Sequence, residues 1–321
     1  MTSAIQQLAD HLLQETGRVV IGAEPVIRRL IIALLARGHV LLEGPPGLGK
    51  TLLAKCLAQQ LGGQCRRVQC TPDLMPSDLT GVNVYRAATQ TFEFVPGPLF
   101  ADVVLVDELN RTGPRTQAAL LEAMEERHVT IDRQTHPLPA DFFVIATQNP
   151  HEFEGTYPLP ESQLDRFLLR LRLAHPDAAT ETQVLQAYDT VTDAREARIA
   201  SLPVIEAGLI ARAREEAAAI TISAAVYGYI TAIAAASRAH AQVSLGLSTR
   251  GALALLRCAR IEAALDGSAF VTPDHVKALA PAVVAHRLIP APEATLEGVD
   301  DDALVAAILG RVPVPRTDAQ P

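Results

Sequence analysis

The sequence predicts an α/β domain built on a five-stranded parallel sheet, followed by an all-helical domain. Up to about residue 175, short apolar runs rich in branched residues alternate with amphipathic stretches, a pattern typical of a parallel sheet covered by helices. The runs at 103–106 and 142–145 are continuously apolar, as expected of strands that are buried on both faces. After residue 178 the chain becomes alanine-rich, and no strand-like run follows.

The first domain is predicted to span residues 1–178. Its strands are expected at 39–43, 66–70, 103–107, 142–147 and 167–173, and its helices at 51–60 and 114–127. Two further segments alternate between apolar and polar residues around a polar turn, and we expect them to be inserted β-hairpins; they cover 82–85 with 91–95 and 129–132 with 135–138.

The second domain is predicted to span residues 179–308 and to contain only helices. These are expected at 204–219, 223–240, 249–265 and 273–286. Ser223, Ser248 and Thr272 stand where a side-chain oxygen can cap a helix, and Pro273 suits a first helical turn. The proline-bearing tail, 309–321, is predicted to be disordered.

Composition excludes several classes of protein. A net charge of -8, scattered basic residues, no Trp and 4% aromatic residues disfavour a nucleic-acid-binding surface. The four cysteines form no CxxC pair and the nine histidines no HExxH motif, so we expect buried thiols and neither a zinc site nor a disulfide framework. Apolar runs fall short of the roughly 20 residues that a membrane span needs, and the N-terminus lacks a secretory pattern. We therefore expect a cytoplasmic protein without membrane insertion.

A phosphate-binding loop stands between the first strand and the helix that follows it. Gly44, Gly49, Lys50 and Thr51 match the pattern GxxxxGK[ST] in the strand-loop-helix context that it requires. Glycines let the backbone N–H groups point inward at phosphate, and the helix N-terminus adds partial positive charge. Lys50 is expected at the β and γ phosphates and the Thr51 hydroxyl at Mg²⁺. The sequence therefore predicts ATP and Mg²⁺ as ligands, with these predicted ATP-binding residues in the loop: Gly44, Pro45, Gly47, Leu48, Gly49, Lys50, Thr51 and Leu52.

Two acids end the third predicted strand. Asp107 is expected to hold Mg²⁺ together with Thr51, and Glu108 to be the base that polarises the attacking water. The alternative is a pair of solvated acids at a strand end. A third polar group, Asn149, follows the fourth strand and is predicted to hold the water or the γ phosphate, unless it only forms a turn before Pro150.

With these motifs in order, the chain resembles the AAA+ ATPases, and within them the MoxR family. The resemblance is strong over residues 18–175 and weaker beyond, and it is carried by VLLEGPPGLGKT at 40–51, GPLFADVVLVDELNR at 97–111, TQAALLEAMEER at 116–127, ATQNP at 146–150 and EGTYPLPESQLDRF at 154–167. It implies an AAA+ P-loop domain with inserted hairpins and an all-α lid domain. It also implies that the phosphate loop is Walker A, that Asp107 and Glu108 are Walker B, and that Asn149 is sensor 1.

The resemblance further assigns two arginines and a base contact. Arg166 corresponds to the arginine finger that reaches a neighbouring subunit, although a salt bridge to Asp165 or Glu161 is an alternative and Arg111 is a rival for the role. Arg250 corresponds to sensor 2, or else is a solvated residue at a helix start. Val20 lies in the segment 19–22 that resembles the family's adenine contact, and ordinary packing explains that segment equally well.

The function implied by the resemblance is that of an ATP-hydrolysing, chaperone-like remodeller. The family's pattern implies a homo-oligomeric, hexameric ring that matures protein partners, often with von Willebrand factor A domains and sometimes with insertion of a metal cofactor. Two alternatives remain from the sequence alone. One is a nucleic-acid motor of the related helix-2-insert ATPases, and the other is a nucleotide-gated binding switch that hydrolyses little ATP.

Overall fold

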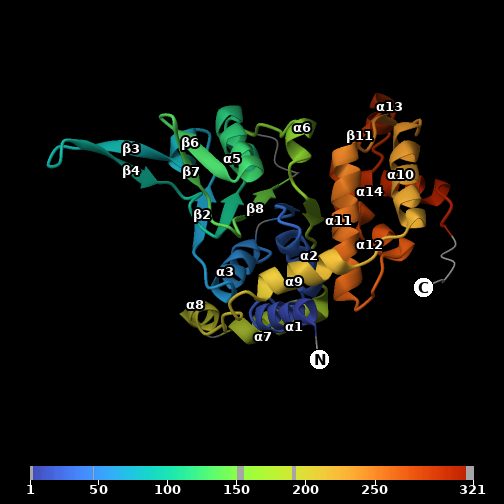
Figure 1. The fold of residues 1–321 in the computed structure, drawn as a ribbon, viewed down its shortest axis with the longest axis horizontal. Coiled ribbons are helices and arrows are strands. Elements are labelled where there is room, and N and C mark those ends of the chain that lie inside the picture. Colours follow the sequence, from blue (N-terminus) through green and yellow to red (C-terminus); the bar gives the residue numbers. More distant parts are fainter. Residues whose placement is uncertain (1–2, 46, 150–154, 190–192, 316–321) are drawn as a thin grey trace.

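The computed structural model describes residues 3–45, 47–149, 155–189 and 193–315 (Figure 1). Its central sheet has five parallel strands in the order β2-β5-β8-β1-β9. These are β1 (Val40–Glu43), β2 (Cys65–Gln69), β5 (Val103–Asp107), β8 (Phe143–Gln148) and β9 (Leu169–Arg172). The five predicted strands are confirmed, each within two residues of its expected bounds.

Both faces of this sheet are buried, because side chains alternate between two hydrophobic clusters. Val40 and Leu42 of β1 point into one cluster and Leu41 into the other. The first face is covered by α1 (Ala4–Gly17), α2 (Glu24–Leu35) and α3 (Lys50–Gln60). The opposite face packs against α4 (Pro76–Thr80) and α5 (Pro114–Glu126), with the short α6 (Glu161–Leu164) at its margin.

Both predicted hairpins are confirmed, and they are fastened to each other. The first, β3 (Gly81–Arg86) with β4 (Thr91–Pro96), projects far from the body of the molecule (Figure 1). The second consists of β6 (His128–Ile131) and β7 (Gln134–Pro137). The Phe94 and His136 rings stack with centroids 4.0 Å apart, and the Asn83 amide donates to Asp132 at 2.8 Å. Side chains of the two hairpins therefore contact each other directly.

Three helices after residue 178 lie along the α/β part. They are α7 (Ala178–Tyr188), α8 (Asp193–Ala200) and α9 (Leu209–Ala219). The Glu216 carboxylate of α9 accepts from the first two N–H groups of α1, each at 2.9 Å, and α9 packs against α1 (Figure 1). The boundary expected at residue 178 is therefore not the spatial one. Helix α9 also begins at Leu209 and not at 204; its N-cap, Gly208, has a left-handed conformation with φ of 80° that favours glycine.

The remaining helices form the lid, namely α10 (Ala224–Arg238), α11 (Thr249–Leu265), α12 (Pro273–Val284), α13 (Pro292–Leu296) and α14 (Asp301–Arg311). The predicted caps are confirmed, since Ser223, Ser248 and Thr272 each accept a hydrogen bond from a backbone N–H of the first turn. Two expectations are corrected here. The lid is not free of strands, because β10 (Val243–Leu245) pairs with β11 (Ile289–Pro290). Residues 309–311 belong to α14 and not to a disordered tail, while 316–321 lie outside the described residues.

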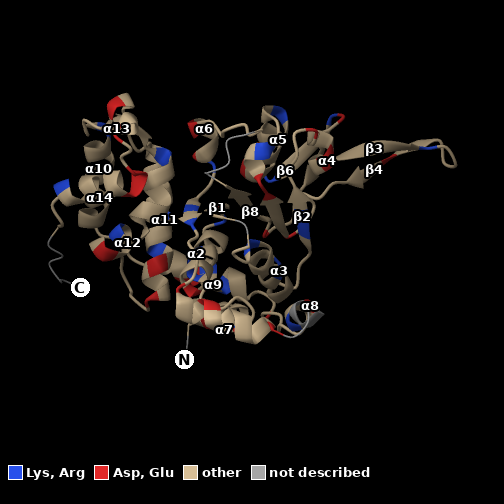
Figure 2. Ribbon diagram, turned by 180° about the vertical axis from the view of Figure 1, so that it is seen from behind, with Lys and Arg blue, Asp and Glu red and all other residues tan. Residues whose placement is uncertain are grey.

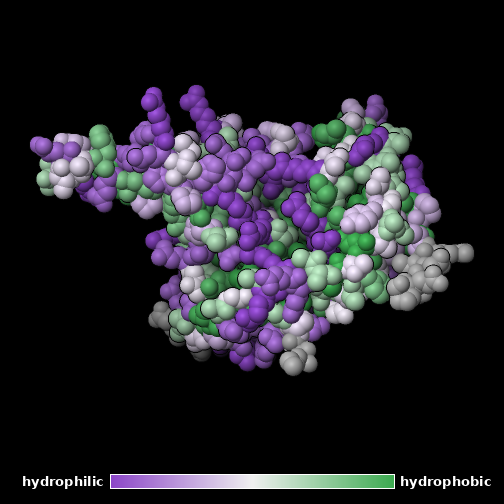
Figure 3. Space-filling view, viewed as in Figure 1, coloured by the Kyte–Doolittle hydropathy of each residue, from purple (hydrophilic) through white to green (hydrophobic). Residues whose placement is uncertain are grey.

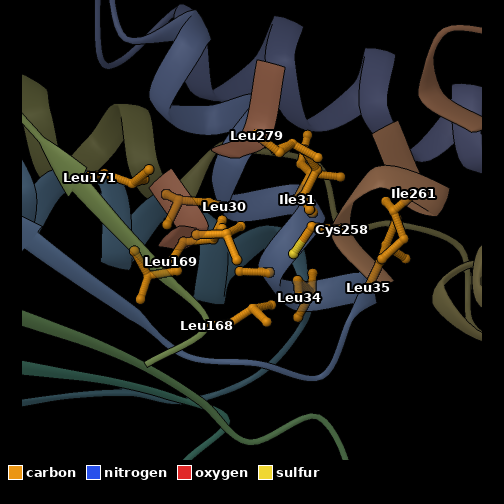
Figure 4. Close-up of a cluster of buried hydrophobic side chains, with 14 of the residues drawn as sticks. Leu30, Ile31, Leu34, Leu35, Leu168, Leu169, Leu171, Cys258, Ile261 and Leu279 are labelled. Carbon is orange, nitrogen blue, oxygen red and sulfur yellow. The ribbon is translucent and has the colours of Figure 1, made fainter. Parts of the chain in front are cut away.

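The lid and the sheet share one hydrophobic cluster. Figure 4 shows side chains of α2 and β9 packed against those of α11 and α12, among them Leu30, Leu169, Cys258 and Leu279. Burial raises the pKa of the Cys258 thiol to about 12, and it does the same for two further thiols, those of Cys56 and Cys70. All four cysteines are free; Cys56, Cys70 and Cys258 are buried, and Cys65 is partly exposed. Among the described residues, every helix is too short or too polar to cross a membrane.

Candidate functional site: a nucleotide cleft and a second, arginine-lined cleft

The phosphate loop leaves the sheet at the carboxyl end of β1 and enters α3. Gly44 has φ of 151°, and a Cβ built there would lie 2.7 Å from the carbonyl oxygen of Leu173. Gly49, in the left-handed conformation with φ of 76°, is the N-cap of α3. Glycine is therefore required at Gly44 by a close approach of backbone and at Gly49 by its conformation.

Lys50 closes the loop from the first residue of α3. Its Nζ donates to the Gly44 carbonyl oxygen at 2.9 Å. Burial lowers the pKa of Lys50, whereas the carboxylates of Asp107 and Glu108 act in the opposite direction. A partly buried ammonium facing two acids is well placed to receive an anionic phosphate.

A cleft of about 660 Å³ opens in front of this loop. Of the predicted loop residues, these line the cleft: Gly44, Gly47, Gly49, Lys50, Thr51 and Leu52. Pro45 and Leu48 belong to the loop but are not among the lining residues. The cleft thus brings together the end of β1, the start of α3 and the ends of the neighbouring strands.

Asp107 is buried at the carboxyl end of β5, and its carboxylate accepts two side-chain hydrogen bonds. Its carboxylate accepts from Arg67 Nε at 2.7 Å and from the Thr147 hydroxyl at 3.1 Å. Arg67 lies on β2 and Thr147 on β8, the two strands that flank β5. The carboxylate is therefore fixed from both sides in front of Lys50.

Glu108 has a left-handed backbone conformation, φ 58° and ψ 50°, which turns its side chain into the cleft. Its carboxylate accepts from the Gln69 amide at 2.9 Å and pairs with Arg111 Nε at 3.0 Å. A non-glycine residue in this conformation at the end of a buried strand is a common sign of a functional site. Arg111 lines the same cleft as Glu108 and the phosphate loop of the same subunit.

Asn149 also lines this cleft, directly after β8. The side chain of the preceding residue, Gln148, donates to Glu43 at 2.6 Å, and Thr147 accepts from the backbone N–H of Glu108 at 2.9 Å. The end of β8 is therefore tied to β1 and β5, and Asn149 lies beside the two acids, as the order of strand ends predicts.

These groups fit a magnesium nucleotide. The hydroxyl of Thr51 and the carboxylate of Asp107 are hard oxygen donors, the type that Mg²⁺ prefers, and Mg²⁺ is usually held by few protein ligands together with phosphate and water. No cluster of three or more His, Cys, Asp or Glu side chains suited to another metal occurs in the described part of the chain.

Several cleft residues were not predicted from the sequence. Gln69 and Arg67 lie near the carboxyl end of a predicted strand, which was a usable signal for both. That Gln69 is the register partner of Asp107 is known only from the pairing of β2 with β5 in the structure. Glu196 and Ile199 enter the cleft from α8, more than 130 residues beyond the phosphate loop, and nothing in the local pattern indicates them.

Arg166 and Arg250 line a different cleft, of about 190 Å³, in which none of the described residues of the phosphate loop takes part. Arg166 pairs with Glu125 of α5 at 3.1 Å, and not with Asp165 or Glu161 as the alternative had it. Arg250 pairs with the same Glu125 at 2.9 Å. Arg250 therefore lies beside Arg166 and is not among the lining residues of the nucleotide cleft of its own subunit, so its predicted roles in nucleotide binding and as sensor 2 stay predictions.

Val20 is buried next to the phosphate loop. Its Cγ1 is 3.5 Å from the position of an ideal Cβ at Gly49, and it is not among the lining residues of the nucleotide cleft. The segment that contains it is held by α7, where the Tyr188 hydroxyl donates to the Val19 carbonyl. An adenine contact at Val20 stays a prediction.

Comparison with known proteins places the whole chain beside a group of ATPases. Residues 39–169 match the family described as ATPase family associated with various cellular activities (AAA), and 235–308 match the AAA lid domain. The protein YeaC of Bacillus subtilis is 43% identical over 97% of this chain and 96% of its own length. Chaperone MoxR1 of Mycobacterium tuberculosis is 36% identical over 97% of this chain and 84% of its own. A crystal structure from Cytophaga hutchinsonii, 36% identical, superimposes with a TM-score of 0.89 over 97% of this chain and 96% of that one.

Proposed function

Since this chain belongs to the MoxR family of AAA ATPases, we propose that it works as a ring of copies in which Arg166 and Arg250 of one subunit complete the ATP site of the next. One observation carries this proposal. Both arginines line a cleft separate from their own phosphate loop, with Glu125 between them, and this separation supports a role at a nucleotide that another subunit holds. A hexamer is the assembly that we expect.

Within each subunit the cleft side chains have distinct roles. Lys50 binds the β and γ phosphates, and Thr51 with Asp107 holds Mg²⁺, which would neutralise phosphate charge. Glu108 accepts the proton of the attacking water, and Asn149 orients that water or the γ phosphate. Arg67 and Gln69 fix the two carboxylates from β2, so β2 sets the geometry of the acids.

The assembly proposal predicts that ATP turnover per molecule rises with protein concentration. An isolated subunit lacks the two guanidinium groups that stabilise charge in the transition state, so dilution is expected to lower the specific rate by at least about tenfold. The measurement is steady-state phosphate release over a dilution series, with particle mass followed by light scattering in ATP. A specific rate that stays constant while the mass falls to that of a monomer would contradict the proposal.

We propose that the clients are proteins, contacted by the projecting β3–β4 hairpin. Tyr85 and Phe92 face each other across this hairpin with ring centroids 5.4 Å apart, and both are exposed. The projecting hairpin carries both hydrophilic and hydrophobic surface (Figure 3). Aromatic residues are enriched at protein-protein interfaces relative to the rest of the surface. Lys and Arg are scattered among Asp and Glu over the described ribbon (Figure 2), which disfavours a nucleic-acid track.

The client proposal is tested by capture. The Glu108→Gln variant, loaded with ATP, is expected to enrich specific proteins from a lysate, whereas Lys50→Ala, which is expected not to hold ATP, is the control. Proteins with von Willebrand factor A domains are the first candidates. Insertion of a metal cofactor into such a client is one form that its maturation could take. Enrichment of nucleic acid alone, together with stimulation of the ATPase by DNA, would instead favour a nucleic-acid motor. We also propose that the protein and its clients are located in the cytoplasm.

A further inference from the structure

One carboxylate holds both of the arginines that we assign to the neighbouring site. Glu125, near the end of α5, accepts from Arg250 Nη2 at 2.9 Å through one oxygen and pairs with Arg166 Nη1 at 3.1 Å through the other. Arg166 comes from the segment between α6 and β9, whereas Arg250 is in the first turn of α11 in the lid. Glu125 therefore links the α/β part to the lid through the two guanidinium groups.

The cleft around Glu125 carries an excess of positive charge. Six arginines line it, against the two carboxylates of Glu125 and Asp165; the arginines are Arg37, Arg127, Arg166, Arg250, Arg257 and Arg287. Burial and the nearby charges of Arg37 and Arg214 lower the pKa of Arg127, as expected where cations crowd together.

The second carboxylate is already committed to a buried partner. Arg287, only 3% exposed, donates through Nε to Asp165 at 2.7 Å, and its other nitrogens donate to the backbone carbonyls of Phe167 and Leu168. Asp165 lies 3.9 Å from Arg250 Nε, at the limit of an ion pair. Glu125 is thus the main anionic partner of Arg166 and Arg250.

We propose that Glu125 is a positioning residue that holds Arg166 and Arg250 in the free subunit and competes with the γ phosphate of a neighbouring subunit's ATP. The inference rests on the proposed function, since it requires the two arginines to act between subunits. A carboxylate and a phosphate offer the same kind of oxygen pair to a guanidinium. The side chains of Glu125 and Arg250 are 35% and 50% exposed, so this ion pair is weak and exchange is easy.

The exchange has a measurable consequence. A phosphate that approaches the two guanidinium groups competes with Glu125 for them, so the negative charge of Glu125 opposes assembly around ATP. Glu125→Gln keeps the shape of the side chain and removes that charge. The arginines of the variant can then bind the phosphate of a neighbouring subunit at a lower protein concentration. The variant is therefore expected to gain activity in dilute solution, an effect that damage to the fold does not produce.

The test compares protein-concentration curves of the ATPase for the wild type, Glu125→Gln and the matched control Glu122→Gln. Glu122 is one turn earlier on α5 and exposed. Its substitution by Gln therefore removes the same charge from the same helix. Glu125→Gln is expected to reach half-maximal specific rate at a concentration about three- to tenfold lower than the wild type. Glu122→Gln is expected to follow the wild-type curve. The double variant Glu125→Gln/Arg166→Ala is expected to lose the gain.

Each outcome separates the two proposals. A Glu125→Gln curve that coincides with the wild type, or that shifts to higher concentration, overturns the competition while the assembly proposal stands. An equal shift for Glu122→Gln also overturns it, because the effect is then one of overall charge. A wild-type rate that is independent of concentration in a monomer overturns the proposed function itself.

Discussion

Replacing Glu108 by Gln is expected to lower the turnover of ATP by about two to four orders of magnitude while ATP binding stays within a few-fold of the wild type. The substitution removes the base but keeps a side chain of the same shape. Gln69 and Arg111, which hold the Glu108 carboxylate, remain in place to hold the amide. Steady-state phosphate release and binding of a fluorescent ATP analogue measure the two effects separately.

The control for this variant is Glu122→Gln, an exposed acid on α5 outside the cleft. It is expected to hydrolyse ATP at the wild-type rate. Undiminished hydrolysis in Glu108→Gln would remove Glu108 from the role of base, and loss of nucleotide binding in the same variant would show that its carboxylate supports the loop and not the chemistry.

Replacing Arg166 by Ala is expected to lower turnover by about three orders of magnitude, because an arginine that stabilises transition-state charge typically contributes that much. ATP binding to the variant is expected to persist, since Arg166 is outside the nucleotide cleft of its own subunit. Mixing the variant with Lys50→Ala subunits tests the direction of action. The Lys50→Ala subunits keep their arginines, so the mixture is expected to regain part of the activity that neither variant has alone.

The mixing experiment also decides between Arg166 and Arg111. Arg111 pairs with Glu108 in its own cleft, so an Arg111→Ala defect is expected to resist rescue by Lys50→Ala neighbours. If Arg166→Ala is not rescued either, Arg166 acts within its own subunit or only in the fold. If only Arg111→Ala is rescued, Arg111 is the arginine that acts on the neighbouring subunit, and Arg166 acts within its own.

Much of the nucleotide cleft was predictable because its residues stand at strand ends. In a parallel sheet the carboxyl ends of the strands meet at one edge, so an ordered reading of the strands places Lys50, Asp107, Glu108 and Asn149 together. The partners of these groups were less visible. Gln69 required the register of β2 against β5, which depends on long-range pairing and not on local pattern.

The position of Arg250 was beyond sequence reasoning for a different reason. Its helix was predicted with its bounds and cap, yet where the first turn of that helix points depends on how α11 packs against α2. That packing is set by side chains far apart in the sequence. The β10–β11 pair was missed because three residues and two are too few to show an alternating pattern.

The buried seam between α2, β9, α11 and α12 (Figure 4) limits how freely members of this family can exchange parts. Leu30 and Leu169 on one side and Cys258 and Leu279 on the other are buried in one shared cluster, and close-packed interiors tolerate little change in volume. A lid transplanted from a relative would bring only half of that surface. A functional chimera therefore has to carry α2 and β9 with the lid, so the module that is inherited intact is larger than the lid alone.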